Sequence, residues 1–366
     1  MCLRVLIFPT STGQGHNQAS KALKEYLDSR GVETTISDVL DTGKKKKSTG
    51  VSKLYEWLVN RVPRVFGALY AIGEHISSSR RHSPIYYLNA LYADSLCQTI
   101  EDERPDVIVC PHLFSAQAVT RLIEKKKLNI PTVGINTDYC WSPFWEETRL
   151  DRYVVADEVV AQECAARGMK RETLLPLGIP VSAKFSEKMP KEQARAAFGI
   201  PNETVFVING GSMGYGKIPE LAAALVRRRP DAAVVAVCAR NAAAYNKVKD
   251  IKGVTALEFV ENIDVLLDAA DVLLTKPGGL STTEAMVKRL PFVITMPIPG
   301  GEERNAAHIA QTGMAVLAET VEDAADAACR LATDEEARRA MRQAQERYCS
   351  ESAARDIGEL VISLAR

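Results

Sequence analysis

Short runs of apolar, mostly β-branched residues recur along this 366-residue chain, and longer amphipathic stretches separate them. Apolar runs of four to six residues that alternate with helical patterns are typical of parallel strands covered by helices on both faces. The pattern therefore predicts an α/β fold with two Rossmann-like, doubly wound sheets. The expected strands are residues 4–9, 33–38, 106–110, 132–136 and 152–156 in the first half, and 205–209, 233–238, 254–259, 272–275, 292–296 and 315–317 in the second.

The length of the chain exceeds what one ordinary hydrophobic core organises, so we expect two domains. A proline- and glycine-containing stretch at residues 178–190 marks the boundary. We predict an N-terminal domain at residues 1–182 and a C-terminal domain at 183–349, with a helix at about 350–366 that packs back on the first domain. Parallel sheets bind ligands at the carboxyl ends of their strands, so we expect the two sheets to face each other across a cleft.

Charge and cysteine usage exclude several classes of protein. The net charge is zero, which argues against a general nucleic-acid binder, and the eight cysteines form no CxxC pair. We therefore expect reduced thiols in the cytoplasm, with no disulfide framework and no metal site. No run of eighteen apolar residues is present, so we expect at most a peripheral contact with a membrane.

A glycine-rich loop follows the expected strand at 205–209. Glycines allow a tight turn that brings backbone N–H groups close to phosphate oxygens, and the dipole of the following helix favours negative charge. The loop therefore predicts a diphosphate site, with a ligand-free βα turn as the alternative. No GK[ST] follows, which argues against hydrolysis of a nucleoside triphosphate. The loop consists of Gly210, Gly211, Ser212, Met213 and Gly214.

A second glycine turn lies at residues 277–279, after a strand that we expect to end at Lys276. Residues 281–284 then open a helix, with Glu284 expected in its first turn. A carboxylate at this position can accept two hydrogen bonds from a vicinal diol such as ribose. The alternative is a capping carboxylate that only complements the helix dipole.

The first expected strand runs into residues 11–16 (STGQGH), which open a helix. His16 has the pKa range of a general base that removes a proton from an attacking hydroxyl. Asp138 follows the strand at 132–136 on the same sheet edge, so it is either the base itself or the partner that orients the imidazole. The alternatives are a histidine bonded to a neighbouring loop and an ordinary Asx turn.

Residues 42–92 carry nine basic and two acidic side chains, a local charge of about +7, interleaved with aromatic residues. Basic side chains attract anionic lipids, and aromatic rings settle at the membrane interface. The segment therefore predicts docking to an anionic membrane surface. The alternative is a solvated basic insertion whose aromatic residues belong to the core. No nucleic-acid-binding motif accompanies it, so we expect no nucleic-acid partner.

Several of these motifs together resemble glycosyltransferase family 28, in its diacylglycerol-glycosylating branch of monogalactosyldiacylglycerol synthases and processive diacylglycerol glucosyltransferases. The resemblance rests on GGSMG at 210–214, TKPGGLSTTEA at 275–285, Ile179-Pro180, Thr137-Asp138-Tyr139 and residues 151–156 (DRYVVA). It implies a GT-B fold, a UDP-sugar donor, a lipid acceptor, and inversion at the anomeric carbon without a required metal or other cofactor.

The resemblance also implies roles for individual residues. The loop at 210–214 would hold the diphosphate, Glu284 the ribose hydroxyls, the backbone at Phe259 and Val260 the uracil, and the loop at 299–305 the sugar. Further donor-binding residues would be Lys276, Gly278, Gly279, Ser281, Thr282, Glu302, Glu303 and Asn305, and acceptor-side residues Thr12, Gly13, Gly15, Tyr139 and Trp145.

The chain departs from the family pattern at three positions. Gly301 stands where the family usually has glutamine, Ser142 where it usually has histidine, and Gln14 where this branch often has glycine. None of these changes removes a residue on which nucleotide binding would depend.

The expected activity is transfer of a hexose from a UDP-sugar to diacylglycerol, by a cytoplasmic enzyme at the inner face of the cell membrane. One alternative is GlcNAc transfer to a polyprenyl-linked peptidoglycan precursor. Others are a UDP-sugar epimerase and a non-catalytic UDP-sugar sensor.

Overall fold

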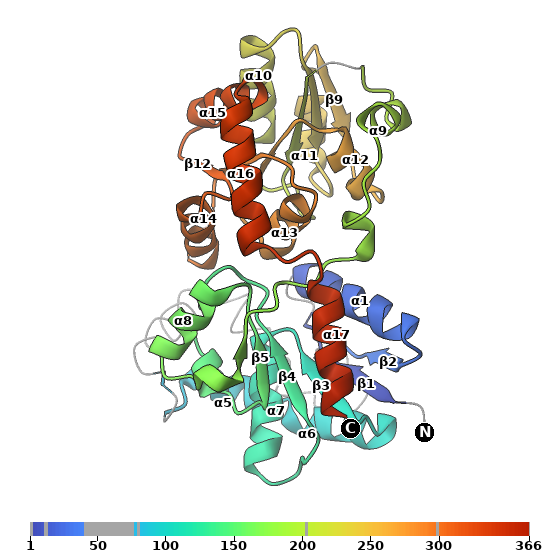
Figure 1. Ribbon diagram of the computed structural model, residues 1–366, viewed down its shortest axis with the longest axis vertical. Helices are drawn as coiled ribbons and strands as arrows, with labels where there is room; N and C mark the ends of the chain where they lie inside the picture. The colour runs from blue at the N-terminus through green and yellow to red at the C-terminus, as the bar shows by residue number, and fades with distance from the viewer. Residues whose placement is uncertain are drawn as a thin grey trace. The chain divides into compact units, whose positions relative to one another are not determined.

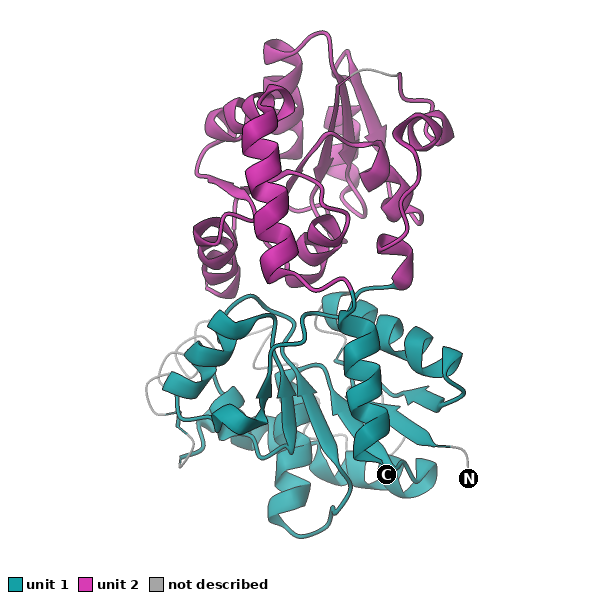
Figure 2. Ribbon diagram, viewed as in Figure 1, with its two compact units in different colours: residues 1–182, 352–366 teal, residues 183–351 magenta. Residues whose placement is uncertain are grey.

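The computed structural model describes residues 3–10, 14–39, 77–78, 81–201, 204–297 and 300–365. The chain divides into two compact units, shown in Figure 2. Unit 1 contains Met1–Ser182 and Ser352–Arg366, and unit 2 contains Ala183–Glu351. Each unit has its own parallel sheet and its own hydrophobic core. The predicted α/β class with two doubly wound sheets is confirmed.

Unit 1 is built on a six-stranded, all-parallel sheet with the order β2-β1-β3-β4-β5-β6. The central strands are buried along their whole length, as strands covered on both faces must be. The strands are β1 (Arg4–Ile7), β2 (Glu33–Ile36), β3 (Val107–Cys110), β4 (Thr132–Ile135), β5 (Arg152–Val154) and β6 (Leu174–Leu175).

Helices cover the unit 1 sheet (Figure 1). The α-helices are α1 (Gln14–Ser29), α5 (Pro84–Ala90), α6 (Ala93–Glu103), α7 (Leu113–Glu124), α8 (Glu158–Ala166) and α17 (Ala353–Leu364). Short 3-10 turns lie at η1 (Trp145–Glu147) and η2 (Arg171–Thr173).

The last helix, α17, packs beside α1 and joins the core of unit 1 (Figure 1). A Cβ added to Gly358 would lie 2.3 Å from the Tyr26 ring, so the missing side chain allows the two helices to approach closely. Tyr26 donates to Glu359 Oε1 at 2.7 Å, and Arg30 pairs with the same carboxylate at 3.2 Å. The C-terminal end of the chain is therefore part of unit 1.

Unit 2 has a second six-stranded parallel sheet, with the order β12-β11-β10-β7-β8-β9. Its strands are β7 (Val205–Asn209), β8 (Ala233–Val237), β9 (Val254–Leu257), β10 (Val272–Thr275), β11 (Phe292–Thr295) and β12 (Val316–Ala318). Its helices are η3 (Ala183–Phe185), α9 (Lys191–Ala197), α10 (Ile218–Arg228), α11 (Ala242–Val248), α12 (Ile263–Ala269), α13 (Gly279–Val287), α14 (Gly301–Gln311), α15 (Val321–Thr333) and α16 (Glu335–Tyr348).

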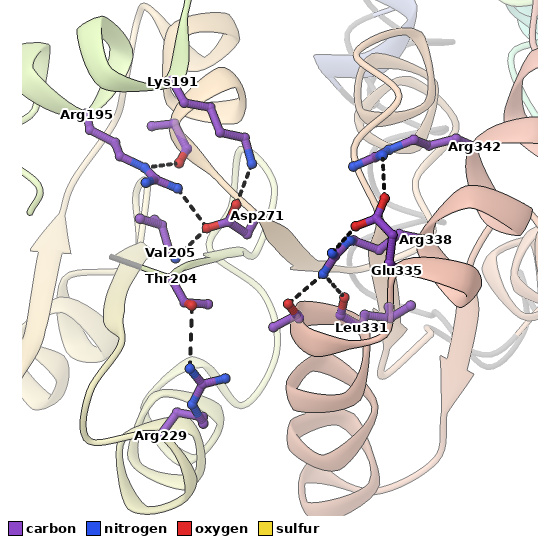
Figure 3. Close-up of polar contacts among 12 residues, drawn as sticks. Lys191, Arg195, Thr204, Val205, Arg229, Asp271, Leu331, Glu335, Arg338 and Arg342 are labelled. Atoms are coloured by element: carbon purple, nitrogen blue, oxygen red, sulfur yellow. Dashed lines mark hydrogen bonds and ion pairs between the residues drawn. The ribbon is translucent and has the colours of Figure 1, made fainter. Parts of the chain in front are cut away.

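Polar contacts stabilise unit 2 at the amino end of its central strands (Figure 3). Asp271, just before β10, accepts from Val205 N at 2.8 Å and from Arg195 Nη2 at 2.7 Å, and it also pairs with Lys191. These contacts attach α9 to the start of both β7 and β10. At the junction of α15 and α16, Arg338 pairs with Glu335 and donates to Leu331 O at 2.9 Å.

Two details of the sequence prediction were wrong. The strand β6 was missed, because it consists of only two residues after a 3-10 turn and carries no periodicity of its own. Helix α13 begins at Gly279 with Gly278 as its N-cap, earlier than expected. Glu284 therefore lies in the second turn of the helix, where it cannot serve as a cap.

The strand orders fix where each unit can bind a ligand. In unit 1 the chain leaves β1 toward β2 on one side and later returns to β3 on the other. In unit 2 the order reverses in the same way between β7 and β10. Ligands of doubly wound sheets bind at these reversals, at the carboxyl ends of the strands. We call the two places the unit 1 switch point (loops after β1 and β3) and the unit 2 switch point (loops after β7 and β10).

Candidate active site

His16 lies at the unit 1 switch point, in the first turn of α1. Its Nδ1 atom is 3.1 Å from Pro111 O, in the loop after β3, and 3.0 Å from Thr137 Oγ1, in the loop after β4. A carbonyl oxygen can only accept, so Nδ1 carries the proton and donates to it. In the neutral ring Nε2 then keeps its lone pair, as a general base requires.

The surroundings keep the His16 imidazole neutral. Burial lowers the pKa of His16 below its usual value, and this effect outweighs the opposing effects of the Asp138 charge and the Pro111 carbonyl. The ring is therefore unprotonated at neutral pH. The negative charge of Asp138 favours the protonated ring once a proton arrives, so the site can both accept a proton and stabilise it.

Asp138 follows β4, and a neighbouring serine orients its carboxylate. Ser142 Oγ lies 3.1 Å from Asp138 Oδ2 and 3.2 Å from Asn136 Oδ1. The Asp138 amide also points to Asn136 Oδ1, at 3.3 Å. Ser142, one of the three residues that depart from the family pattern, thus belongs to the hydrogen-bonded group around Asp138.

His112 is a residue of this site that sequence reasoning missed. It follows β3 as the N-cap of α7, and its Nδ1 accepts from Phe114 N at 3.1 Å. Its ring packs edge-on against His16, with centroids 4.3 Å apart. Burial and the nearby His16 hold the pKa of His112 well below its usual value. Its position directly after a strand, the same signal that pointed to His16, could have revealed it.

The predicted acceptor-side residues divide into three groups. Thr12 and Gly13 lie outside the described residues, and Gly15 is in the first turn of α1 next to His16. Tyr139 and Trp145 are buried, with 1% and 5% of their surface exposed. The Trp145 ring packs against Tyr153 at 6.0 Å and over Gly134, where an added Cβ would lie 2.7 Å from it. Trp145 is thus a packing residue of the unit 1 core.

The glycine loop at 210–214 lies at the unit 2 switch point, between β7 and α10. Gly214 has a φ of +60°, and a Cβ added there would lie 2.0 Å from Cys238 O. A Cβ on Gly210 would lie 2.6 Å from Tyr215 O. The loop is therefore a tight turn pressed against the end of β8, which only glycine permits at these positions.

Internal hydrogen bonds hold the glycine loop in shape. Gly211 N donates to Asn209 Oδ1, Gly214 N to Gly211 O and Tyr215 N to Gly210 O, each at 2.9 Å. Asn241 Nδ2 donates to Gly214 O at 2.8 Å. Met213 projects from the loop with 66% of its surface exposed, and Ser212 is half-buried.

The loop after β10 brings Lys276 to the same switch point. A Cβ added to Gly211 would lie 3.0 Å from Lys276 Cε, so the lysine side chain lies directly against the glycine loop. Gly278 caps α13 and Gly279 is its first residue. The helix dipole therefore points positive charge toward the lysine and the loop. Ser281 and Thr282 lie in the first turn of this helix, and Thr282 Oγ1 donates back to Gly278 O at 2.9 Å.

Glu284 is half-buried on α13. Burial raises the pKa of Glu284 to about 8, with a further contribution from Asp264 and an opposing one from Lys184. Lys184 itself pairs with Asp264 at 2.9 Å. The Glu284 carboxyl is therefore largely protonated at neutral pH in the unliganded unit.

The remaining predicted donor residues lie in the loops around this switch point. Glu302 pairs with Lys276 at 2.5 Å. Glu303 Oε2 accepts from Gly300 N at 3.0 Å and so caps α14, while buried Asn305 donates to Pro277 O at 3.3 Å. Phe259 and Val260 follow β9, and the Phe259 ring is 64% exposed. Glu303 and Asn305 thus have structural roles that their motif did not reveal.

Most of the basic segment at 42–92 lies outside the described residues. Within the described part, Tyr86 and Tyr92 are buried, with 1% and 4% of their surface exposed, which contradicts an interfacial role for these two rings. Tyr87 and Leu91, one helical turn apart at α5, are 59% and 48% exposed. Among the described residues, no helix is long and apolar enough to span a bilayer, and no cluster of metal-ligating side chains is present.

Residues 16–181 match the family model of monogalactosyldiacylglycerol (MGDG) synthase. Two relatives are named processive diacylglycerol beta-glucosyltransferase. The one from Bacillus pumilus is 29% identical over 350 residues, which cover 93% of this chain and 89% of the relative. The one from Bacillus subtilis is 27% identical over 344 residues, which cover 91% and 88%.

Solved structures share the fold of the chain at low sequence identity. Acinetobacter baumannii MurG superimposes with a TM-score of 0.64 at 13% identity, covering 99% of this chain and 100% of that chain. The calicheamicin glycosyltransferase CalG4 gives 0.66 at 15%, covering 100% and 98%. A UDP-GlcNAc 2-epimerase from Neisseria meningitidis gives 0.63 at 15%, covering 99% and 100%. These likenesses show a GT-B fold. With the family-model match and the sequence relatives, they make this chain a relative of the diacylglycerol-glycosylating branch of glycosyltransferase family 28.

Proposed function

We propose that this protein is an inverting glycosyltransferase that transfers a hexose from a UDP-sugar to diacylglycerol. The observation that carries the proposal is the match to processive diacylglycerol glucosyltransferases over about nine-tenths of both chains. The unit 1 switch point supports it, because His16 there has the tautomer of a general base. The fold neighbours include MurG and an epimerase, but they resemble the chain in architecture alone.

In this proposal unit 1 serves the acceptor. The acceptor hydroxyl gives its proton to His16 Nε2 as its oxygen attacks the anomeric carbon, and His16 Nδ1–H stays bonded to Pro111 O. The new carbon–oxygen bond forms as the bond from the anomeric carbon to the phosphate oxygen breaks, with inversion. The Asp138 carboxylate stabilises the imidazolium that results.

Unit 2 serves the donor. The amides of Gly211, Gly214 and Tyr215 donate within the loop, so phosphate binding by the loop falls to the amides of Ser212 and Met213. The amino end of α13 and the Lys276 ammonium supply positive charge to the departing diphosphate. Preorganised donors of this kind act where charge develops in the transition state. We therefore propose that the reaction needs no metal ion.

We further propose that the protein associates with the anionic inner face of the cell membrane. The basic charge of residues 42–92 and the exposed Tyr87 and Leu91 support this. The protein should sediment with vesicles that contain anionic lipid and be released by salt. Equal binding to neutral vesicles, or no binding, would contradict the proposed association.

The function is tested by incubating the protein with diacylglycerol and a panel of radiolabelled UDP-sugars, without metal. We expect label in the organic phase with one or more of the sugars. Label only on a polyprenyl-linked acceptor would indicate the GlcNAc transferase. Interconversion of UDP-sugars without transfer would indicate the epimerase, and binding without turnover a sensor.

A further inference from the structure

Lys276 and Glu302 form an ion pair at the unit 2 switch point. Lys276 Nζ lies 2.5 Å from Glu302 Oε1, and the two side chains are only 23% and 19% exposed. Lys276 follows β10, and Glu302 is in the first turn of α14, 26 residues later. An ion pair shielded to this degree is stronger than an exposed one, and breaking it needs a substitute partner for each charge.

The lysine lies where three loops meet. Its Cε is 3.0 Å from the position that a Cβ on Gly211 would occupy, and its Nζ is 3.7 Å from the corresponding position on Gly278. The glycine loop, the N-cap of α13 and the start of α14 therefore surround one ammonium group. The proposed function gives the glycine loop and the amino end of α13 to the diphosphate, and the family resemblance gives the loop at 299–305, which includes the start of α14, to the sugar.

We propose that Glu302 is a specificity-determining residue that exchanges partners when the donor binds. In the free protein Glu302 neutralises Lys276. When a UDP-sugar enters, the diphosphate takes over Lys276, and Glu302 turns to accept hydrogen bonds from the sugar hydroxyls. This inference rests on the proposed function, because it requires the diphosphate at the unit 2 switch point.

The exchange distinguishes a UDP-sugar from UDP. Both ligands bring a diphosphate that displaces Glu302, but only the UDP-sugar offers hydroxyls to the displaced carboxylate. With UDP, the carboxylate is left close to the diphosphate charge without that compensation, and the repulsion weakens binding. After transfer has removed the sugar, Glu302 returns to Lys276 and promotes release of UDP.

The test is calorimetric titration of UDP and of UDP-glucose, in metal-free buffer, into wild type, Glu302→Gln, Lys276→Met and the double variant. Glu302→Gln removes the competing charge, so it should tighten UDP by about tenfold while UDP-glucose tightens less or weakens. Lys276→Met should weaken both ligands. In its background the effect of Glu302→Gln on UDP should shrink to the part that comes from direct repulsion between the carboxylate and the diphosphate, since the cycle isolates the coupling between the two residues.

Two further variants keep the test decisive. Lys276→Arg retains the charge if the methionine variant fails to fold, and it should preserve the effect of Glu302→Gln. Glu322→Gln is the matched control, because it removes the charge of another paired carboxylate. Glu322, on α15, pairs with Arg228, at the end of α10, at 2.6 Å. It should leave both affinities within twofold of wild type.

Unchanged or weaker UDP binding by Glu302→Gln would overturn the exchange while leaving the donor site intact. An equal gain for UDP and UDP-glucose would overturn the role in specificity. If the wild-type protein bound neither ligand, that result would contradict the proposed function and therefore the exchange as well.

Discussion

The two switch points arise from the same reversal of strand order, but their loops carry different kinds of side chains. At the unit 1 switch point two imidazoles pack together, and a backbone carbonyl fixes the tautomer of His16. At the unit 2 switch point the loop is built from glycines, and its charges are an ammonium and a carboxylate. Parallel sheets thus position loops at their reversals, whereas the residues in those loops decide which ligand chemistry each can serve.

Burial shifts the pKa of a titratable side chain in each unit, and the two shifts have opposite directions. It lowers the pKa of His16 and raises that of Glu284, so that each group is neutral in the free protein near pH 7. A neutral imidazole is ready to take a proton. A carboxylate accepts two hydrogen bonds from a diol more strongly than a neutral carboxyl, so binding of a diol favours loss of the proton. The comparison therefore predicts that unit 1 gains a proton in catalysis and unit 2 releases one on binding the nucleotide.

The largest effect is expected from His16→Ala. Removing the base should lower kcat by at least about a hundredfold, the range of general-base contributions, and leave the affinity for UDP unchanged. Steady-state kinetics with titration of UDP measures both. His82→Gln is a control, since His82 pairs with Glu124 away from the switch point. Full activity of the His16 variant would show that another group removes the proton.

The next effect is expected from Gly214→Ala. Its Cβ would overlap Cys238 O, so the glycine loop must move and the affinity for UDP should fall more than about tenfold. Gly216→Ala is the matched control, because Gly216 also has a positive φ but has open space around its Cβ position. It should change UDP affinity less than about threefold. Equal losses in both variants would indicate backbone strain rather than close packing.

The pH dependence of UDP binding sharpens the comparison further. If the ribose hydroxyls bind Glu284, as the family resemblance implies, they favour its ionised form. Binding should then release a proton, and affinity should rise with pH and level off above the free pKa of about 8. We expect about a tenfold gain between pH 6.5 and 8.5. Calorimetry in buffers of different ionisation enthalpy measures the proton release directly. Glu284→Gln should abolish it; an undiminished release would assign the proton to another group.

The smallest functional effect is expected from Asp271→Asn, at the opposite end of the unit 2 sheet. The change weakens contacts to Val205 N, Arg195 and Lys191 and should lower the free energy of unfolding by ~2 kcal/mol. The affinity for UDP should not change. Asp231→Asn, in an exposed pair with Arg229, should leave the free energy of unfolding in urea nearly unchanged. A loss of UDP affinity in the Asp271 variant would show that the two sheet ends are coupled.

Local pattern was enough to predict most of the fold and the strand-end positions of His16 and the glycine loop. Apolar runs mark parallel strands, and polar residues directly after them fall at the ligand-binding edge. The start of α13 was misjudged because both glycines at 278–279 were read as a turn, whereas one caps the helix and the other begins it. The two-residue β6 carries too little pattern to be recognised.

The contacts within the sites could not be read from the sequence. The Lys276–Glu302 pair depends on the paths of two loops, and the burial of Tyr139 and Trp145 depends on the packing around β4. The motif resemblance assigned these residues as ligand contacts. A motif records which residues occur together in a family, but it does not record what each side chain touches. The tautomer of His16 likewise follows only from the position of Pro111 O.

A crystal structure of the protein with UDP tests the central claim most directly. We expect the diphosphate within hydrogen-bonding distance of the Ser212 and Met213 amides and of Lys276 Nζ, with the ribose hydroxyls on Glu284 and Glu302 separated from Lys276. Nucleotide density in unit 1, or at unit 2 away from the loops after β7 and β10, would contradict the account.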